Sequence, residues 1–492
     1  MKEVIIIGAG LGGLSTALRL SSLGFKVKII EKYKTPGGRL NKLQLDKFTF
    51  DIGPSFMSMT YEFDELLKST NVQNKLILEP LDPLYNVFFE NKNKPYRIWK
   101  DLNKLQEEFQ NIETNLATKV EKFLNKAGEF FHNTEDKVIR TNFENKIDYL
   151  IKLSKVPKKY IPYLFKSVWT EVSKNFNSQE IRIIFSLVAF FLGSTPFRTP
   201  AIYTLLNYTE LRHNGYWKIT GGMYKIVEFI VEVLKERNVE LILNTEIVDY
   251  KAEKNRINYF LDTNNNKWEA DLYVVNSDAA FFRGKVLKRK KFSESKLDKM
   301  DWTMAPFTIY LGIKGKIDNL DHHNYFLGSN FKGYASKIFT SSISPQKPYY
   351  YVNVSSKSNA SCAPNGCENV FILCPVPDLR FKKDWSDKYE LANNIIEDLS
   401  RRIDFDIKKN ILVQEIYDPT DWMKMFNLYK GSGLGLAHGL NQVGAFRPQN
   451  KDEDYNNLYY VGASTIPGTG LPMVIISSKL VTERIINDYS IR

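Results

Sequence analysis

The first 31 residues of the chain form a strand, a glycine-rich turn, a helix and a second strand. Residues 4–7 are all β-branched and run directly into the glycine turn of residues 8–13. A helix is predicted over residues 11–23, and a second strand over residues 26–30 ends at Glu31. Such a turn between a strand and a helix restricts the chain to α/β folds in which helix amides can face a phosphate.

Each position of this motif has a physical role. Gly8 permits the tight turn, Gly10 lets the backbone approach a pyrophosphate, and Gly13 lets the helix pack closely on the sheet. The carboxylate of Glu31 can accept hydrogen bonds from ribose hydroxyls. Because the strands, the helix and the acid occur together at the required spacing, the segment predicts a dinucleotide site.

A second pair of glycines, ending in Gly38, is followed by Arg39. This arrangement resembles the extended signature of flavoproteins with two dinucleotide-binding motifs, in which the second turn and the arginine lie along the same pyrophosphate. The guanidinium suits a diphosphate. The pattern therefore favours FAD over NAD, and the alternative is a surface turn with a solvated arginine.

Composition limits the partners and the compartment. The 492 residues are enough for two or three domains, and a net charge of +12 favours an anionic membrane surface. No zinc finger, RNA-binding aromatic signature or basic recognition helix occurs, so nucleic acid is not expected. The histidines and cysteines match no metal-binding spacing, so no metal is expected. An odd count of three cysteines indicates a reducing cytoplasm.

No apolar run reaches the roughly 18 residues that span a bilayer. The longest, residues 183–192, fits either a buried helix or one dipping into a membrane face. Residues 152–169 interleave lysines with leucine and aromatic residues, a pattern that can lie in a membrane interface or form a solvated helix face. We therefore predict a cytoplasmic, peripheral membrane protein. The histidine pair at residues 322–323 lies in a polar stretch and is expected to be exposed.

Sequence patterns alternate along the chain, which predicts two interleaved domains. Nucleotide-domain patterns occupy residues 1–60, 221–300 and 431–492. They predict an α/β, Rossmann-like FAD domain that is discontinuous in sequence. Residues 61–220 and 301–430 are predicted to form a mixed, largely helical domain that binds substrate and contacts the membrane.

The C-terminal segment adds a second flavin signal. Residues 458–473 read as a strand, a loop rich in glycine and proline, and a helix start. Amides at a helix start stabilise the negative charge that a reduced flavin gathers at its pyrimidine edge. Alone, this loop would be an ordinary turn.

Four stretches together resemble the phytoene-desaturase-type carotenoid desaturases of bacteria and fungi. They are the opening motif through residue 39, residues 48–55, residues 191–206 and residues 462–472. The third stretch lies in the predicted substrate domain. The resemblance covers nearly the whole chain and implies an FAD-dependent, peripherally membrane-bound enzyme that acts on carotenoids.

The resemblance also implies roles for single residues. It places Gly8, Gly10, Gly13, Glu31, Gly38 and Arg39 on the adenosine diphosphate, Pro54 and Ser55 near the flavin, Val248 against the adenine through its backbone, and Gly462, Ala463, Pro472 and Met473 along the ribityl chain and flavin ring. FAD is expected to be non-covalent, because residues 455–480 contain no cysteine.

Enzymes of this kind remove two hydrogens beside a polyene, one as a hydride to the flavin and one as a proton. Asp148 falls where the family has a candidate acid/base residue, although its neighbours also read as an ordinary surface helix. Glu210 and His213 are weaker candidates.

The wording of residues 53–59 and 469–473 is similar to the hydroxycarotenoid 3,4-desaturase branch. The favoured substrate is therefore a 1-hydroxycarotenoid, with phytoene and neurosporene as alternatives. Two other functions remain open on this fold: an amine oxidase, and a non-enzymatic protein that binds prenyl lipids.

Overall fold

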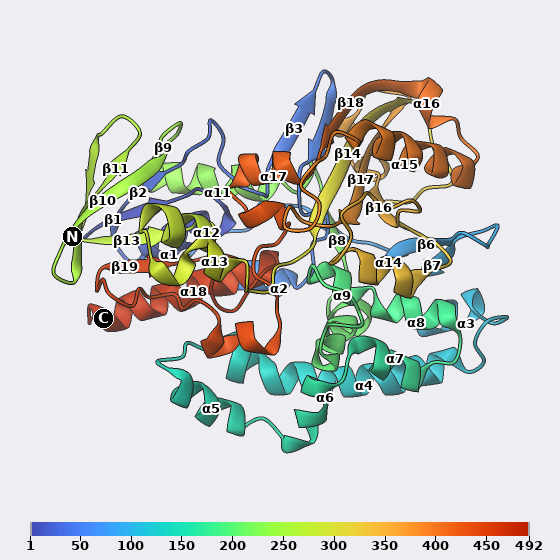
Figure 1. Ribbon diagram of the computed structural model, residues 1–492, viewed down its shortest axis with the longest axis horizontal. Helices are drawn as coiled ribbons and strands as arrows, with labels where there is room; N and C mark the ends of the chain where they lie inside the picture. The colour runs from blue at the N-terminus through green and yellow to red at the C-terminus, as the bar shows by residue number, and fades with distance from the viewer. Residues whose placement is uncertain (1, 491–492) are drawn as a thin grey trace.

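The opening motif forms the centre of a five-stranded parallel sheet. In the computed structural model, which describes residues 2–490, the strand order is β19–β13–β1–β2–β9 (Figure 1). The strands are β1 (Glu3–Ile7), β2 (Lys26–Ile30), β9 (Glu240–Ile242), β13 (Leu272–Val275) and β19 (Leu458–Tyr460). Three distant stretches of chain thus share one sheet, and the predicted α/β fold is confirmed.

Both faces of this sheet are buried, which explains the continuous apolar run in β1. Successive side chains of a strand point to opposite faces. Val4 and Ile6 therefore pack with helices, and Ile5 and Ile7 pack with a second sheet. The helices are α1 (Leu11–Ser22), α11 (Lys225–Glu236) and α18 (Leu471–Asp488), and the second sheet consists of β10 (Ile247–Glu253), β11 (Arg256–Asp262) and β12 (Lys267–Glu269).

A seven-stranded mixed sheet lies at the other end of the molecule (Figure 1). In spatial order its strands are β18 (Ile411–Tyr417), β14 (Ala305–Lys314), β17 (Cys367–Val376), β16 (Tyr350–Asn353), β15 (His323–Leu327), β6 (Tyr85–Phe89) and β7 (Tyr96–Ile98). Helix α15 (Lys388–Ile403) shares the apolar core on one face of this sheet. The opposite face shares a core with the helical insertion.

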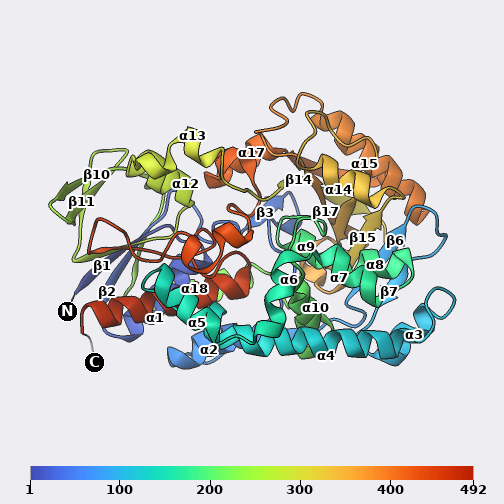
Figure 2. The ribbon, with the colours of Figure 1, turned by 60° about the horizontal axis from the view of Figure 1, so that its bottom comes forward.

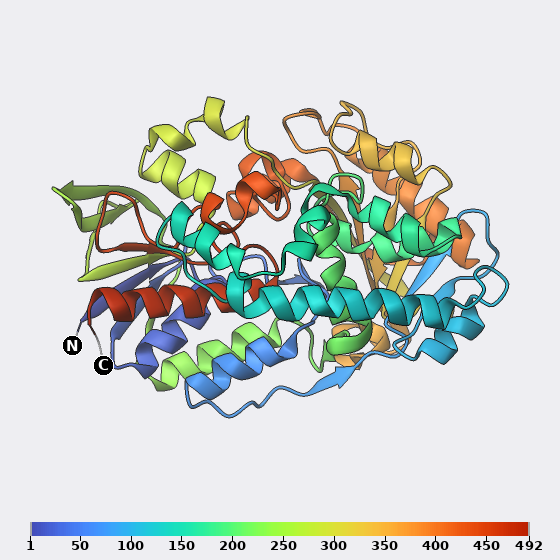
Figure 3. The same ribbon diagram turned by 90° about the horizontal axis from the view of Figure 1, so that it is seen from below.

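The helical insertion runs below both sheets, and Figure 3 shows the long helix α4 crossing this surface. Its helices are α3 (Leu102–Glu108), α4 (Leu116–Thr134), α5 (Lys146–Ser154), α6 (Ile161–Phe165), α7 (Val168–Asn175), α8 (Gln179–Ser186), α9 (Val188–Phe191) and α10 (Leu205–Tyr208). The apolar run of residues 183–192 spans α8 and α9, and Ile183, Ile184 and Phe185 are almost fully buried. Of the two alternatives, the buried helix is therefore the correct one for that run.

Two short segments connect the cores. Phe48 and Phe50 of β4 (Phe48–Asp51) pack into the core beneath the seven-stranded sheet, whereas α2 (Thr60–Ser69) packs against α18 and α1 (Figure 2). The remaining elements are β3 (Lys42–Leu45), β4 (Phe48–Asp51), α2 (Thr60–Ser69), β5 (Leu78–Pro80), β8 (Trp217–Ile219), α12 (Ala279–Phe281), α13 (Glu294–Leu297), α14 (Phe331–Lys337), α16 (Ile407–Asn410) and α17 (Pro419–Phe426).

The expectation that the histidine pair is exposed was wrong. His323 begins β15, between β16 and β6 in the sheet, and only 1% of it is accessible. The strand begins inside the polar stretch, so that His323 and Asn324 belong to β15 and only the polar residues before them form the loop. Among residues 2–490, no helix is both long and apolar enough to cross a membrane.

Candidate active site and cofactor cleft

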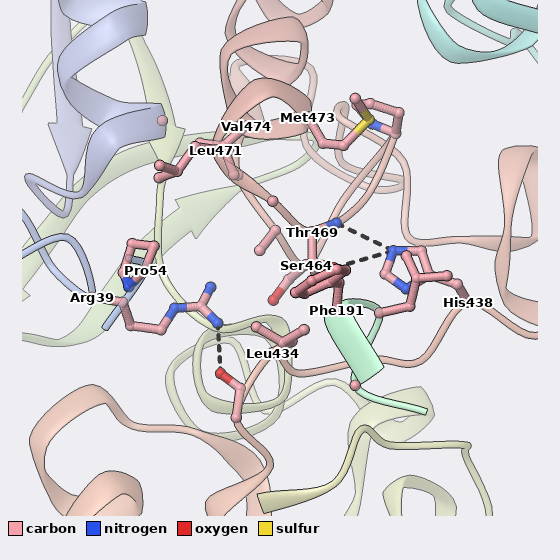
Figure 4. A pocket seen from close by; sticks show the side chains of 18 of the residues that line it. Arg39, Pro54, Phe191, Leu434, His438, Ser464, Thr469, Leu471, Met473 and Val474 are labelled. Atoms are coloured by element: carbon pink, nitrogen blue, oxygen red, sulfur yellow. Dashed lines mark hydrogen bonds between the residues drawn. The ribbon is translucent and has the colours of Figure 1, made fainter. Parts of the chain in front are cut away.

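A cavity of about 900 Å³ connects the two ends of the molecule. It begins at the carboxyl ends of β1 and β2, where ligands bind in open α/β sheets. Most of the predicted cofactor residues share its wall: Gly8, Gly10, Glu31, Gly38, Arg39, Pro54, Ser55, Gly462, Ala463, Pro472 and Met473. Figure 4 shows Arg39 and Pro54 facing the C-terminal loop across this space. Residues far apart in sequence are thus brought together, and their contacts with FAD stay a prediction.

Two helix starts open onto this cavity. Helix α1 begins after Gly10 and helix α18 begins after Gly470, and neither has a side-chain cap. The first amides of a helix need a partner, and an anion can supply it. One helix start suits a pyrophosphate and the other suits the pyrimidine edge of a flavin, so the donor set fits FAD.

Glu31 is held in place by the glycine turn. Its Oε2 accepts a hydrogen bond from the Ala9 amide at 2.7 Å, and its Oε1 accepts one from the Tyr33 amide at 3.0 Å. Burial raises the pKa of Glu31, and these amide bonds oppose that rise. Each carboxylate oxygen retains a second acceptor site, which is what the predicted ribose contact requires.

Gly13 lies behind the cavity wall. A Cβ at Gly13 would come 2.1 Å from the carbonyl oxygen of Gly8, so the close packing of helix on strand requires glycine there. Asn276 joins both flavin motifs: its Oδ1 accepts from the Gly13 amide at 2.9 Å, and its Nδ2 donates to the Val461 carbonyl at 3.1 Å. The sequence signal for Asn276 was its place after a buried strand.

Val248 also lies outside the cavity wall. The wall is formed instead by Thr245, Glu246 and Ile247, and Val248 is 40% exposed. The register of β10 against β11 shifts between Ile247 and Asp249, which turns this residue outward. The side chain therefore faces solvent, and the predicted backbone contact with adenine stays untested.

Arg39 brings a half-buried positive charge to the cavity wall. Its Nη1 donates to the Gly433 carbonyl at 3.0 Å, as Figure 4 shows. Burial lowers the pKa of Arg39, and the neighbouring Asp278 opposes that change. Asp278 in turn accepts the amides of Ala280 and Phe281 at the start of α12.

Two residues that sequence reasoning missed, one buried and one half-buried, fix the C-terminal loop. Arg447 is 1% exposed, and its guanidinium donates only to backbone carbonyls: those of Leu436, Ala437, Gln442, Ala463 and Thr465. His438 lines the cavity, and its Nε2 accepts from the Thr469 amide at 3.2 Å (Figure 4). Burial lowers the pKa of His438 to about 3, so this imidazole is neutral.

Asp148 lies apart from the cavity. Its carboxylate accepts from the Glu144 amide at 3.0 Å and pairs with Lys152 Nζ at 2.8 Å, and these contacts lower the pKa of Asp148. A half-buried carboxylate that is paired with a lysine and is not part of the cavity wall is poorly placed to accept a substrate proton, since a base must lie within hydrogen-bond reach of it. The geometry thus gives the acid/base prediction no support.

The two weaker candidates differ from each other. Glu210 is 2% exposed and lies behind the cavity wall, and burial raises the pKa of its carboxyl to about 7. His213 packs among Tyr61, Phe131 and Tyr208 and does not reach the cavity wall.

Comparisons with known proteins agree with this architecture. Residues 11–486 match the flavin-containing amine oxidoreductase family. A zeta-carotene-forming phytoene desaturase of Myxococcus xanthus is 32% identical, over 98% of this chain and 94% of that protein. A carotenoid 3,4-desaturase of Haloarcula japonica is 27% identical over 99% of both chains. The crystal structure of an oxidoreductase from Methanosarcina mazei superposes with a TM-score of 0.65 at 16% identity, covering 98% of this chain and all of that one.

The chain therefore belongs to the flavin-containing amine oxidoreductases and is an FAD-dependent oxidoreductase. Within that family it belongs to the carotenoid desaturases, as the sequence resemblance predicted.

Proposed function

We propose that this enzyme desaturates a carotenoid beside its polyene, and that its preferred reaction is 3,4-desaturation of a 1-hydroxycarotenoid. The observation that carries the proposal is the apolar part of the cavity, which continues from the flavin motifs to the seven-stranded sheet. Its wall contains Leu187, Phe190, Phe191, Leu205, Leu206, Leu327, Leu373 and Trp422. A largely apolar channel of this composition suits a hydrocarbon chain and offers little to a hydrophilic amine.

Within this reaction, bound FAD supplies the acceptor for a hydride. The chain contributes alignment and exclusion of water. The apolar wall holds the polyene by burying it, and Phe56 and Phe191 pack edge to face, with ring centroids 5.2 Å apart. At the other end of the cavity, the FAD would be held by Arg39, Glu31 and the start of α18, which line it. The names of the relatives in Myxococcus and Haloarcula support the carotenoid assignment.

Reconstitution with defined substrates tests the proposal. Purified protein loaded with FAD is incubated with liposomes that contain either phytoene or a 1-hydroxycarotenoid, and products are separated by chromatography. New conjugation in the hydroxylated substrate supports the full proposal. If only phytoene is converted, the protein is still a carotenoid desaturase, but the assignment of a 1-hydroxycarotenoid as its substrate is rejected.

We also propose that the protein binds the membrane through α5 and α6. Large apolar side chains there are unusually exposed: Ile147 (70%), Leu150 (56%), Ile151 (56%), Ile161 (49%) and Phe165 (78%). Lysines surround them at positions 146, 152, 155, 158, 159 and 166. We call these apolar residues the α5–α6 patch. Leu150 belongs both to this patch and to the cavity wall, so a carotenoid could pass from the bilayer into the cavity here.

Flotation with vesicles tests the membrane proposal. Replacing Ile151 and Phe165 by serine should reduce recovery with anionic vesicles, because the patch loses buried apolar area. The matched control replaces Ile343 and Leu412, which are 61% and 54% exposed and lie outside α5 and α6. If the patch variant and the control variant float equally well, the α5–α6 patch is not the membrane contact. Equal recovery of the wild type with neutral and anionic vesicles at low salt would reject the electrostatic contribution.

A further inference from the structure

One section of the otherwise apolar cavity wall carries hydroxyl groups. Ser55, Tyr216, Tyr325 and Tyr351 all line the cavity, and we call them the hydroxyl wall. Phe56 lies among them, with ring centroids 4.7 Å from Tyr216 and 5.2 Å from Tyr351. A hydrocarbon needs no such groups, and buried phenols normally find hydrogen-bond partners.

The heavy-atom contacts behind this wall allow a direction to be assigned to its hydrogen bonds. The Asn353 amide Nδ2 donates to the His322 carbonyl at 2.9 Å and also lies 3.3 Å from His323 Nδ1; because an amide NH2 cannot accept, we assign Nδ1 as an acceptor and place the ring hydrogen on Nε2. Tyr351 Oη lies 2.6 Å from the same Nδ1 and therefore donates to it. Ser55 Oγ lies 2.9 Å from Tyr351 Oη, and under this assignment it donates to the phenol, whose own hydrogen points to the histidine.

This direction leaves the hydroxyl wall with a spare acceptor. Ser55 has used its only hydrogen on Tyr351, so its oxygen can still accept but cannot donate. Neutral His323 is required for this direction, and its burial and its neighbour His322 hold the pKa of His323 well below its usual range. The stacked ring of Phe56, 3.9 Å from the imidazole between centroids, shields the histidine from the cavity.

One phenol of the wall and one carboxylate oxygen behind it have no hydrogen-bond partner among residues 2–490. Tyr325 Oη and Glu210 Oε1 are buried without a hydrogen bond, in side chains that are 8% and 2% exposed. The centroid of the Tyr85 ring lies 5.3 Å from that of Tyr325 and 6.4 Å from that of Tyr216. An unpaired buried phenol is costly, and a ligand oxygen at this place would satisfy it.

We propose that the hydroxyl wall is the subsite that binds the hydroxyl group of the substrate's end, with the substrate donating to Ser55 Oγ and accepting from Tyr325 Oη. The inference rests on the proposed carotenoid desaturation and adds the residues that select the substrate. Ser55 follows Pro54 at the predicted flavin end of the cavity. A 1-hydroxyl is only a few bonds from the 3,4 bond, so this subsite would hold the reacting bond near the flavin.

The direction of the hydrogen bonds makes the proposal specific. A methoxy group keeps the oxygen of the substrate but has no hydrogen to donate. The wild type should therefore convert a 1-hydroxycarotenoid about tenfold more efficiently, by kcat/KM, than its 1-methoxy analogue. Tyr351→Phe releases the hydrogen of Ser55, which can then donate to either substrate, so the preference should largely disappear. Tyr325→Phe should lower kcat/KM for the hydroxylated substrate, relative to kcat/KM for the parent hydrocarbon, by a similar factor.

Tyr149→Phe is the matched control. It removes a phenol from the cavity wall at α5, away from the hydroxyl wall, and should leave both ratios unchanged. Because ratios of two substrates are compared within one variant, a partial loss of folded protein or of FAD cancels. Binding is measured separately as quenching of protein fluorescence, since Trp422 also lines the cavity.

The outcomes separate the two proposals. Unchanged ratios in Tyr351→Phe and Tyr325→Phe, with active wild type, would overturn the subsite and leave the desaturase intact. If the wild type converts no carotenoid, the proposed function fails. In that case, tighter binding of the hydroxylated compound that is lost in Tyr351→Phe would still support the subsite, and equal binding would overturn it.

Discussion

Replacing Glu210 by glutamine should change how the stability of the protein depends on pH. Burial raises the pKa of this carboxyl from 4.5 to about 7, and the phenols of Tyr85 and Tyr216 partly oppose the change. A group whose pKa is higher in the folded state favours folding when protonated. Its contribution is therefore complete below about pH 4.5 and is lost as the pH rises through about 7.

The size of the effect follows from the same values. A pKa raised from 4.5 to about 7 corresponds to about 3 kcal/mol of folding free energy lost between pH 4.5 and pH 8. Glutamine stays neutral, so Glu210→Gln avoids this loss. For a chain of 492 residues, about 3 kcal/mol corresponds to roughly 3 °C in Tm. The variant should melt about 3 °C above the wild type at pH 8 and close to it at pH 5.

Differential scanning fluorimetry from pH 5 to pH 8.5, with excess FAD, measures this difference. Comparing wild type and variant at each pH removes the contributions of other shifted groups, such as Asp51, whose pKa is raised to about 6 by burial. Glu236→Gln, on the exposed side of α11, is the control and should give a flat difference. If the difference in Tm between Glu210→Gln and the wild type stays constant from pH 5 to pH 8.5, the pKa of Glu210 is not raised by folding and the reasoning is refuted.

Three further predictions concern the cofactor. Glu31→Ala should weaken FAD binding by about 10- to 100-fold in titrations, because it removes the ribose acceptor and frees two backbone amides; unchanged affinity would contradict the role. Arg447→Met should yield protein with little bound FAD and a lower Tm, because five buried carbonyls lose their donor; a normal ratio of flavin to protein absorbance would argue against it. Acid precipitation should release all flavin into the supernatant, since no cysteine lines the cavity among the described residues, and yellow pellets would disprove non-covalent binding.

The parts of the fold that could be predicted from sequence are those with local causes. The β1–turn–α1–β2 motif depends on contacts between neighbours in the sequence, and its strand and helix bounds agree with the prediction to within a residue. The close packing at Gly13 has the physical cause that was assigned to it. Val248 faces outward because of a shift in strand register, which no local pattern reveals.

The residues that sequence reasoning missed act over long distances. Asn276 links Gly13 to Val461, and the role of Arg447 depends on backbone carbonyls of other segments to which it donates. A lone asparagine or arginine in a sequence looks like any other polar residue. His323 shows the same limit, because a polar loop hides the start of a buried strand.

The proposed membrane contact and the proposed hydroxyl wall place opposite demands on one ligand. The α5–α6 patch and strand β16, which carries Tyr351, lie well apart in Figure 1, yet both contribute to the same cavity. A substrate with one hydroxylated end could leave its hydrocarbon end toward the bilayer while its polar end reaches the buried acceptor. Moving that hydroxyl out of water costs free energy unless it is paired again. The hydroxyl wall would return this free energy only when the polar end arrives beside the flavin, which would favour the orientation that desaturation requires.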